Sequence, residues 1–260
     1  QQGAAMNEII TVRGLTKSFA DGEKKVTALN GVDLTVYEGD IFGVIGLSGA
    51  GKSTFVRCLN RLEEPDEGSI IINGQDVREE DIFTICLNSY RASGTGGYIA
   101  RRNIGMIFQQ FNLLSQASIL DNVCFPMEIA HWKKADAKKR ALELIKLVGL
   151  AGRENAYPAQ LSGGMKQRCA IARAFAIDPP ILLMDEPFGA LDAVTRAKLQ
   201  DMVIELWHKQ EPKKTVFFVT HDVDEAILLS TKIFVLGQSP SNVIFTCDIP
   251  ADNRPTRETQ

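Results

Sequence analysis

The sequence predicts an α/β fold, in which a mainly parallel sheet covered by helices is accompanied by antiparallel strands and a helical region. In the last third, short apolar runs alternate with helical segments, over residues 181–184, 194–209, 215–220, 223–229 and 233–236. Such alternation builds a parallel sheet with helices on both faces. Residues 8–13 and 29–36 instead alternate apolar and polar side chains, which is typical of half-buried antiparallel strands. Residues 118–131 and 135–148 carry apolar residues at helical spacing, which predicts two helices.

Shorter patterns predict further elements. The apolar run Ile41–Ile45 ends at a glycine and predicts a buried strand, and Ile70–Asn73 leads into the turn pair Asn73-Gly74. Residues 79–102 have weak periodicity and contain a glycine-rich run, so we expect a surface excursion there. The helix at 135–148 is expected to carry one apolar face, made of Leu142, Ile145 and Val148.

Composition and charge fit an ordinary α/β protein. The 260 residues are 45% hydrophobic and 23% charged, with a net charge of −3. A core can therefore form, and nucleic acid is not expected as a partner, because the basic residues are spread along the chain rather than clustered. We expect no membrane-spanning segment, since no run of about 18 apolar residues occurs, and no secretory signal is visible.

The chain ends and the cysteines carry little functional signal. Gln1–Ala5, before Met6, are interpreted as an expression scar, and residues 249–260 as a polar tail. The five cysteines lie far apart without a CxxC pair, which argues against a disulfide framework or zinc site and indicates a reducing compartment. We expect small buried hydrophobic residues at Cys58, Cys86, Cys124, Cys169 and Cys247.

The segment from Gly46 to Ser53 fits the pattern GxxxxGK[ST] at every fixed position. A predicted strand precedes it and a helix through about Leu62 is expected after it. The glycines let the backbone wrap a phosphate, towards which successive N–H groups and the helix N-terminus point. Lys52 would place its charge on the β- and γ-phosphates, and Ser53 would offer its hydroxyl to Mg²⁺. The predicted nucleotide-binding residues are Gly46, Leu47, Ser48, Gly49, Ala50, Gly51, Lys52, Ser53 and Thr54.

Two acids, Asp185 and Glu186, end another apolar strand. Parallel strands open their C-terminal ends on one edge, so Asp185 is expected beside Ser53 as the Mg²⁺-side carboxylate. Glu186 is expected to reach the attacking water as a general base. His221 follows the strand at 215–220 on the same expected edge, where an imidazole can donate to the γ-phosphate. The alternative for the acid pair is a helix N-terminus whose dipole favours carboxylates.

The run Leu161-Ser162-Gly163-Gly164-Met165-Lys166-Gln167-Arg168 decides between classes of phosphate-loop proteins. Its Ser-Gly-Gly opens a predicted helix through Phe175, so this segment also offers N–H groups to an anion. The alternative is a capped helix start without a ligand. Because the loop at 46–53 already supplies one nucleotide with its contacts, a second anion-binding helix end needs an explanation.

Together these segments resemble the ATP-binding cassette (ABC) ATPases. The run LSGGMKQR is similar to the signature motif of that family, and it stands between a phosphate loop and an ILLMDEP segment, in the family's order. The resemblance covers about residues 8–248 and implies a P-loop NTPase (RecA-like) core with an antiparallel β subdomain and an inserted α-helical subdomain. It also implies roles for single residues: adenine stacking for Phe19, contact with Mg²⁺ and water for the Q-loop residue Gln109, the D-loop for Asp192, and the switch histidine for His221.

The resemblance further implies a domain layout and a dimer. The core and β subdomain would span about 6–111 and 165–248, and the helical subdomain about 112–164. In this family two cassettes face head to tail, and each ATP lies between the phosphate loop of one chain and the signature of the other. The partner's ATP would then contact Leu161, Ser162, Gly163, Gly164 and Gln167. Because the catalytic set is complete, a homodimer would have two active sites.

The function that the resemblance implies is the ATP-hydrolysing, energy-coupling subunit of a bacterial importer. It would lie peripherally at the cytoplasmic face of the inner membrane, with permease subunits and, indirectly, a solute-binding protein as partners. Residues 185–193 and 220–226 look like nitrate, sulfonate and taurine importers, whereas 107–114 looks more like methionine or polar amino-acid importers. The methionine type carries an extra C-terminal domain, for which the chain ends too early. The alternatives are an exporting or regulatory ABC ATPase and a P-loop kinase, which would leave the signature unexplained.

Overall fold

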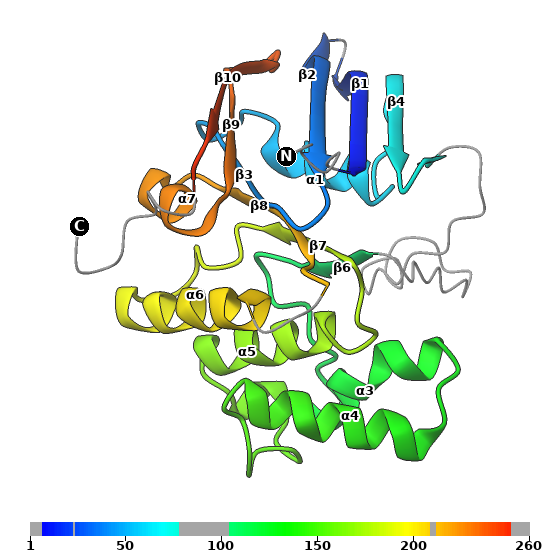
Figure 1. The fold of residues 1–260 in the computed structure, drawn as a ribbon, viewed down its shortest axis with the longest axis vertical. Helices are drawn as coiled ribbons and strands as arrows, with labels where there is room; N and C mark the ends of the chain where they lie inside the picture. The colour runs from blue at the N-terminus through cyan, green and yellow to red at the C-terminus, as the bar shows by residue number, and fades with distance from the viewer. Residues whose placement is uncertain (1–6, 23, 78–103, 209–211, 251–260) are drawn as a thin grey trace, which may run out of the picture. The chain divides into compact units, whose positions relative to one another are not determined.

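The structure, a computed structural model, describes residues 7–22, 24–77, 104–208 and 212–250. The chain forms two compact units (Figure 1). Unit 1 consists of residues 1–81 with 211–260, and unit 2 of residues 82–210. Over the described ranges, no helix combines the length and apolar character that a membrane crossing requires. The expected surface excursion at 79–102 lies outside the described residues.

Unit 1 contains an antiparallel sheet with the strand order β2-β1-β4-β5 (Figure 1). Its strands are β1 Glu8–Asp21, β2 Lys24–Tyr37, β4 Glu67–Ile72 and β5 Gln75–Asp76. Asn73-Gly74 joins β4 to β5 with φ values of 52° and 78°, the positive pair that a tight type I′ hairpin turn requires. The strands expected at 8–13 and 29–36 are confirmed but are longer, because pairing of β1 with β2 continues to Asp21 and Lys24 after the apolar alternation ends.

The other strands of unit 1 form a mainly parallel sheet in the order β10-β9-β3-β8. The elements are β3 Ile41–Ile45, α1 Lys52–Leu59, β8 Thr215–Thr220, α7 Val223–Leu229, β9 Lys232–Leu236 and β10 Val243–Asp248. Strand β3 lies between β8 and β9 and is parallel to both. Its Phe42 stacks on Phe217 at 5.5 Å and contacts Phe234 at 4.3 Å between ring centroids. Strands β3 and β8 have their predicted bounds, because each is a nearly unbroken apolar run.

Unit 2 contains two parallel strands and a set of packed helices (Figure 1). The elements are β6 Ile104–Ile107, α3 Ile119–Ile129, α4 Lys134–Leu147, a 3₁₀ turn at Pro158–Gln160, α5 Gly163–Ala174, β7 Ile181–Asp185 and α6 Ala193–His208. Ser118 begins α3 with a capping box, in which Ser118 Oγ accepts from the Asp121 N–H and the Asp121 carboxylate accepts from the Ser118 N–H. The buried Asn122 side chain donates to the Leu114 and Ala117 carbonyls, each at 3.1 Å, and so ties the preceding loop to α3.

Two predictions for unit 2 differ from the structure. The predicted apolar face of α4 is wrong at Leu142, which is 40% exposed, whereas Ala141, Leu144 and Ile145 are buried. The buried face is set by contact of α4 with α3 and α5, and it includes the alanines Ala137 and Ala141 besides Leu144 and Ile145. Strand β6 is not predicted, because its four residues are too few to show an alternation.

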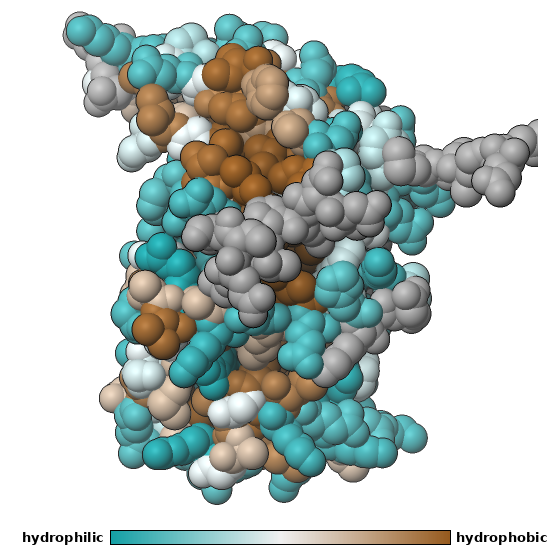
Figure 2. All heavy atoms as spheres, turned by 60° about the vertical axis from the view of Figure 1, so that its left-hand side comes forward, coloured by the Kyte–Doolittle hydropathy of each residue, from teal (hydrophilic) through white to brown (hydrophobic). Residues whose placement is uncertain are grey.

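Strand β10, at the edge of its sheet, is also not predicted from the sequence. Its Ile244 and Phe245 are 63% and 59% exposed, so no buried alternation marks the strand. Figure 2 shows apolar side chains gathered at the surface in the upper part of the view, where Figure 1 has the strands of unit 1. Cys247 on β10 is exposed, which corrects the expectation of a buried thiol, whereas the expectation is confirmed for Cys58, Cys124 and Cys169. Cys86 lies outside the described residues.

Candidate functional site

The phosphate loop joins β3 to α1 in unit 1. Two of its glycines pack closely on neighbouring strands: a Cβ on Gly46 would lie 2.9 Å from the Leu236 carbonyl oxygen, and one on Gly51 would lie 2.8 Å from the Ala28 carbonyl oxygen. Gly51 also has a φ of 75°, in the left-handed region that favours glycine. The residues at the front of the loop are exposed, namely Leu47, Ser48 and Gly49. The glycines therefore fix the back of the loop while its front remains accessible to a ligand.

Lys52 begins α1 and is only 5% exposed. Its Nζ donates to the carbonyl oxygens of Gly46 at 2.8 Å and Leu47 at 2.9 Å, so the ammonium group braces the loop. Ser53 and Thr54 follow, half-buried, in the first turn of α1. A cation, a helix N-terminus and glycine backbone therefore converge at one place, and this arrangement fits a polyphosphate with its Mg²⁺.

His221 follows β8 at the edge of the sheet where the phosphate loop begins. Strands β3 and β8 end in register, because Ile45 pairs with Thr220, and the next residues are Gly46 and His221. The exposed His221 immediately precedes Asp222, which caps α7. The structure places His221 at the edge that the sequence predicts, and its catalytic role stays a prediction.

Phe19 lies on β1 and is 38% exposed. It pairs with Val26 of β2, and Ala28, two residues further along β2, approaches Gly51 of the phosphate loop. Strand β2 therefore connects the surroundings of the Phe19 ring to the loop. Unit 1 thus supplies both an accessible aromatic ring and the predicted phosphate-binding loop.

In unit 2, a carboxylate and an amide meet at the end of β7. Asp185 is the buried last residue of β7, and Glu186 follows with a φ of 44°. Glu186 is therefore in the left-handed region, which costs on the order of 1–3 kcal/mol for a residue with a side chain and is typical of functional sites. Gln109, two residues after β6, donates from Nε2 to Glu186 Oε2 at 3.3 Å. The two predicted catalytic residues of this unit are thus in contact.

Asp192 has a structural role besides its predicted one in the D-loop. Its Oδ1 accepts the Thr195 N–H at 3.0 Å at the start of α6. Hydrogen bonds from Thr195 hold the pKa of this exposed carboxyl below its usual value. A helix cap therefore accounts for the aspartate within the chain, and its assignment to the D-loop stays a prediction.

The signature segment presents the N-terminus of α5. Ser162 caps the helix, since its Oγ accepts the Met165 N–H at 3.3 Å, and both Ser162 and Gly163 are exposed. A Cβ on Gly164 would lie 2.5 Å from Thr195 Cγ2, so close packing of α5 on α6 explains this glycine. A Cβ on Gly163 would make only ordinary contacts at 3.8 Å. Internal packing therefore does not explain the glycine at position 163.

The two other signature residues face the interior of unit 2. Leu161 is 7% exposed and Gln167 is fully buried at 0%, with its Nε2 donating to the Pro187 carbonyl oxygen. Because both side chains are buried, this arrangement does not fit the predicted contact of Leu161 and Gln167 with the ATP of a partner chain. Gln167 instead ties α5 to the residue that follows Glu186, so it supports the site rather than lining it.

Arg173 is a further residue of unit 2, which the motifs do not mark. It lies on α5, is 4% exposed, and donates from Nη1 to the Asn112 carbonyl at 2.7 Å and from Nη2 to the Phe111 carbonyl at 3.1 Å. Burial lowers its pKa to about 10, so the guanidinium remains charged at neutral pH. Arg173 thereby fixes the chain just after Gln109 to the signature helix. The only signal in the sequence is one charge within the otherwise apolar run Cys169–Phe175.

The predicted residues thus fall into two sets. Unit 1 holds the phosphate loop, Phe19 and His221, and unit 2 holds the acid pair, Gln109, the D-loop and the signature. Ser53 belongs to unit 1 and Asp185 to unit 2, so the expected proximity of these two residues stays a prediction.

Comparison with known proteins gives the family. The ABC transporter family model matches residues 29–189. The chain is 44% identical over 229 residues to the methionine import ATP-binding protein MetN of Vibrio vulnificus (strain YJ016). The aligned region covers 88% of this chain and 62% of that protein. For MetN 2 of Enterococcus faecalis the identity is 46% over 228 residues, with coverages of 88% and 62%. The ABC transporter ATP-binding protein MJ0412 of Methanocaldococcus jannaschii is 43% identical over 234 residues, with coverages of 90% and 79%. The chain therefore spans less than two thirds of the MetN proteins that it matches.

Solved structures agree with this assignment. Two dimeric structures of the ATP-binding cassette MJ0796, one in a post-hydrolysis state bound to ADP and Pi, match with a TM-score of 0.78 and 33% identity. Each match covers 94% of this chain and 100% of that chain. The predicted fold class, a P-loop NTPase core with an antiparallel β subdomain and an inserted helical subdomain, is confirmed. The chain belongs to the ABC transporter family and is an ATP-binding ATPase cassette of that family.

Proposed function

We propose that the chain hydrolyses Mg-ATP within a dimer of two cassettes. The observation that carries the proposal is a pair of helix N-termini with glycine in or beside their first turn, at Gly51–Lys52 and at Ser162–Gly163. Helix N-termini attract phosphate groups through their N–H groups and their dipole. One ATP in the phosphate loop accounts for the first of them, and the ATP of a partner chain accounts for the second.

Nucleotide binding would use both units. In unit 1, Phe19 would stack on adenine and Lys52 would bind the β- and γ-phosphates. The Mg²⁺ ion, which neutralises phosphate charge when bound, would be held by Ser53, Gln109 and Asp185. These three supply hydroxyl, amide and carboxylate oxygens, which are the ligand atoms that Mg²⁺ prefers.

The chemical step would depend on Glu186 as general base. Its carboxylate would take the proton of the attacking water, and Gln109, already in contact with it at 3.3 Å, would orient the same water. His221 would donate to the γ-phosphate as negative charge develops there. The left-handed backbone of Glu186 supports its role as the base, because strained backbone conformations are found mainly at functional sites.

Closure of the dimer would place Ser162 and Gly163 on the partner's ATP. The exposed Gly163 supports this, because internal contacts leave room for a Cβ that a phosphate at the helix end would not tolerate. ATP would contact both chains only in the closed state and would therefore favour that state. Hydrolysis would remove this link and let the dimer open.

Replacing Ser162 by arginine tests the dimer. In a Glu186→Gln background, which is expected to retain ATP, the Ser162→Arg chain should bind Mg-ATP normally but remain a monomer in sedimentation. The arginine would cover the N-terminus of α5, whereas the phosphate loop belongs to unit 1. Ser162→Ala is the matched control, because it also removes the helix cap, at a cost of about 1 kcal/mol, but adds no bulk. A Ser162→Arg chain that dimerises with ATP as fully as the control contradicts the proposal.

We also propose that the cassette drives an importer. The support is that the MetN relatives carry the description methionine import ATP-binding protein. Of the solutes that the sequence leaves open, an amino acid of the methionine type fits these relatives, and nitrate, sulfonate and taurine are the alternatives. The subunit would lie peripherally on the cytoplasmic face of a bacterial inner membrane, against permease subunits. A solute-binding protein would deliver the solute to the permease. A helical subdomain at about 112–164 would pass the closing motion to the permease.

Purification from the native membrane tests the importer. A tagged chain extracted in mild detergent should bring down a permease, and ATP turnover of the complex should rise when a methionine-loaded binding protein is added. Loading the binding protein with taurine instead is the matched control. If the taurine-loaded binding protein raises ATP turnover and the methionine-loaded one does not, the methionine assignment is contradicted. If the chain is recovered with an exporter or a membrane-bound regulator instead of a permease, import is contradicted.

A further inference from the structure

We propose that Lys17 positions the ring of Phe19 and thereby sets how strongly the chain prefers a nucleotide to a bare polyphosphate. The inference rests on the proposed stacking of adenine on Phe19. Residues two apart on a strand share one face, so Lys17 and Phe19 lie side by side on β1. The Lys17 Nζ is 5.2 Å from the centroid of the Phe19 ring, within the range of a cation–π contact.

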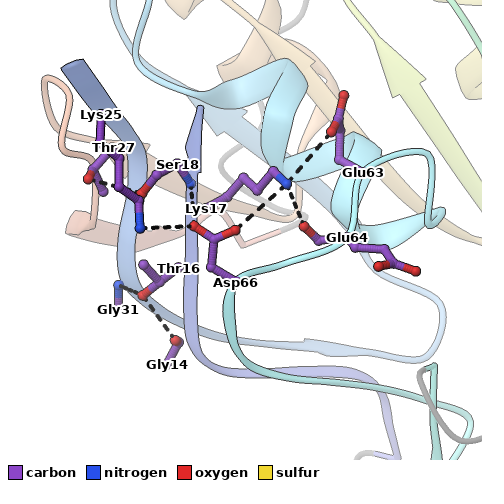
Figure 3. Close-up of polar contacts among 10 residues, drawn as sticks. All are labelled: Gly14, Thr16, Lys17, Ser18, Lys25, Thr27, Gly31, Glu63, Glu64 and Asp66. Carbon is purple, nitrogen blue, oxygen red and sulfur yellow. Dashed lines mark hydrogen bonds and ion pairs between the residues drawn. The ribbon is translucent and has the colours of Figure 1, made fainter. Parts of the chain in front are cut away.

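The ammonium group of Lys17 is held by the segment that follows α1. Its Nζ donates to the Glu64 carbonyl oxygen at 2.7 Å and lies 3.8 Å from Glu63 Oε2 and 3.8 Å from Asp66 Oδ1 (Figure 3). The Lys17 side chain is only 14% exposed. A free lysine side chain samples many rotamers, but one with these partners is confined to few. The cation therefore gives the Phe19 ring a fixed support.

The backbone beside the ring is fixed by the same segment. Asp66 Oδ2 accepts the Ser18 N–H at 2.9 Å, and the Asp66 N–H donates to the Thr16 carbonyl at 2.8 Å. Lys25 lies 3.8 Å from Asp66 Oδ2 as well, but its side chain is 73% exposed (Figure 3). Both the side chain and the main chain next to Phe19 thus depend on residues 63–66.

These contacts connect the base site to the phosphate loop. Helix α1 begins with Lys52 of the loop, and after its end the Glu63 N–H donates to the Arg57 carbonyl of α1 at 3.1 Å. Glu63 then contacts Lys17, and Lys17 contacts Phe19. The ring is therefore held relative to the helix that carries the loop. A preorganised ring lowers the ordering cost of binding, but only for ligands that carry a base.

Calorimetric titration with Mg-ADP and with Mg-pyrophosphate separates the base from the phosphates. We expect Lys17→Met to weaken ADP binding about fivefold and to leave pyrophosphate binding unchanged, since a partly exposed cation–π contact has this size. Lys17→Arg should keep most of the ADP affinity because it keeps a cation. Lys25→Met is the matched control, because it removes an ion pair with the same Asp66 but no contact with the ring, and it should change neither affinity.

A double-mutant cycle with Phe19→Ala shows whether Lys17 acts through the ring. Lys17→Met should have no further effect on ADP binding in the Phe19→Ala background. Equal loss of ADP and pyrophosphate affinity in Lys17→Met, or an undiminished loss in the Phe19→Ala background, overturns the inference and indicates a general structural role. If Phe19→Ala itself leaves the preference for ADP over pyrophosphate unchanged, the proposed stacking fails together with this inference. If Phe19→Ala reduces that preference and Lys17→Met does not, only the inference fails.

Discussion

Replacing Glu186 by glutamine should reduce ATP turnover by roughly 10²–10⁴-fold, because loss of a general base has an effect of this size. Glutamine has the same shape, and its amide oxygen can still accept the hydrogen bond that Gln109 donates at 3.3 Å. The substitution therefore removes proton acceptance and little else. Binding of Mg-ATP should persist, and the ATP-bound dimer should accumulate. Phosphate release in steady state and sedimentation with Mg-ATP measure the two effects.

The control for Glu186→Gln is the same substitution at Glu128, which is exposed on α3. Glu128→Gln should leave turnover unchanged. A Glu186→Gln chain with near wild-type turnover contradicts the assignment of the base. Loss of ATP binding together with turnover shows instead that Glu186 supports the site structurally.

Replacing Lys52 by alanine should weaken ATP binding on the order of 100-fold, because a charge-assisted hydrogen bond to phosphate contributes about 1.5–3 kcal/mol. The substitution also removes the bonds from Nζ to the carbonyls of Gly46 and Leu47, which brace the loop. Affinity should therefore fall through lost charge and through a less ordered loop. Titration calorimetry with Mg-ATP in the Glu186→Gln background measures the effect without turnover.

The control for Lys52→Ala is Lys139→Ala, which removes an exposed lysine from α4. It should leave ATP affinity unchanged. Thermal unfolding of both variants without nucleotide checks that the fold is retained. Unchanged ATP affinity in Lys52→Ala excludes the proposed phosphate contact.

Much of the fold could be predicted because its signals are local. Strand β3 is an apolar run that glycine ends, and the loop after it consists of residue types that only a phosphate-binding turn requires at that spacing. His221 could be placed at the same edge because parallel strands end together. Strand β10 could not be predicted, because its pairing with β9 depends on backbone groups and leaves no apolar pattern.

The supporting contacts of the site could not be predicted because they join distant positions. Gln109 and Glu186 are 77 residues apart, and Lys17 contacts the carbonyl of Glu64, 47 residues away. Arg173 donates to backbone carbonyls, which no residue type reveals. The left-handed backbone of Glu186 is likewise invisible in the sequence, because glutamate rarely adopts that conformation.

The adjacent glycines of the signature have a consequence for inheritance. Because a Cβ at residue 164 would lie 2.5 Å from Thr195 Cγ2, a larger residue 164 is expected to disturb the packing of its own subunit. In a cell that also carries an intact gene copy, the normal subunit would then compensate. An altered residue 163 meets only ordinary contacts, so we expect a folded subunit whose own phosphate loop is intact. On the proposed dimer, such a subunit would still join normal subunits and spoil one of two shared sites. In a cell that carries a normal and an altered gene copy, defects at Gly164 would therefore be recessive, and defects at Gly163 dominant.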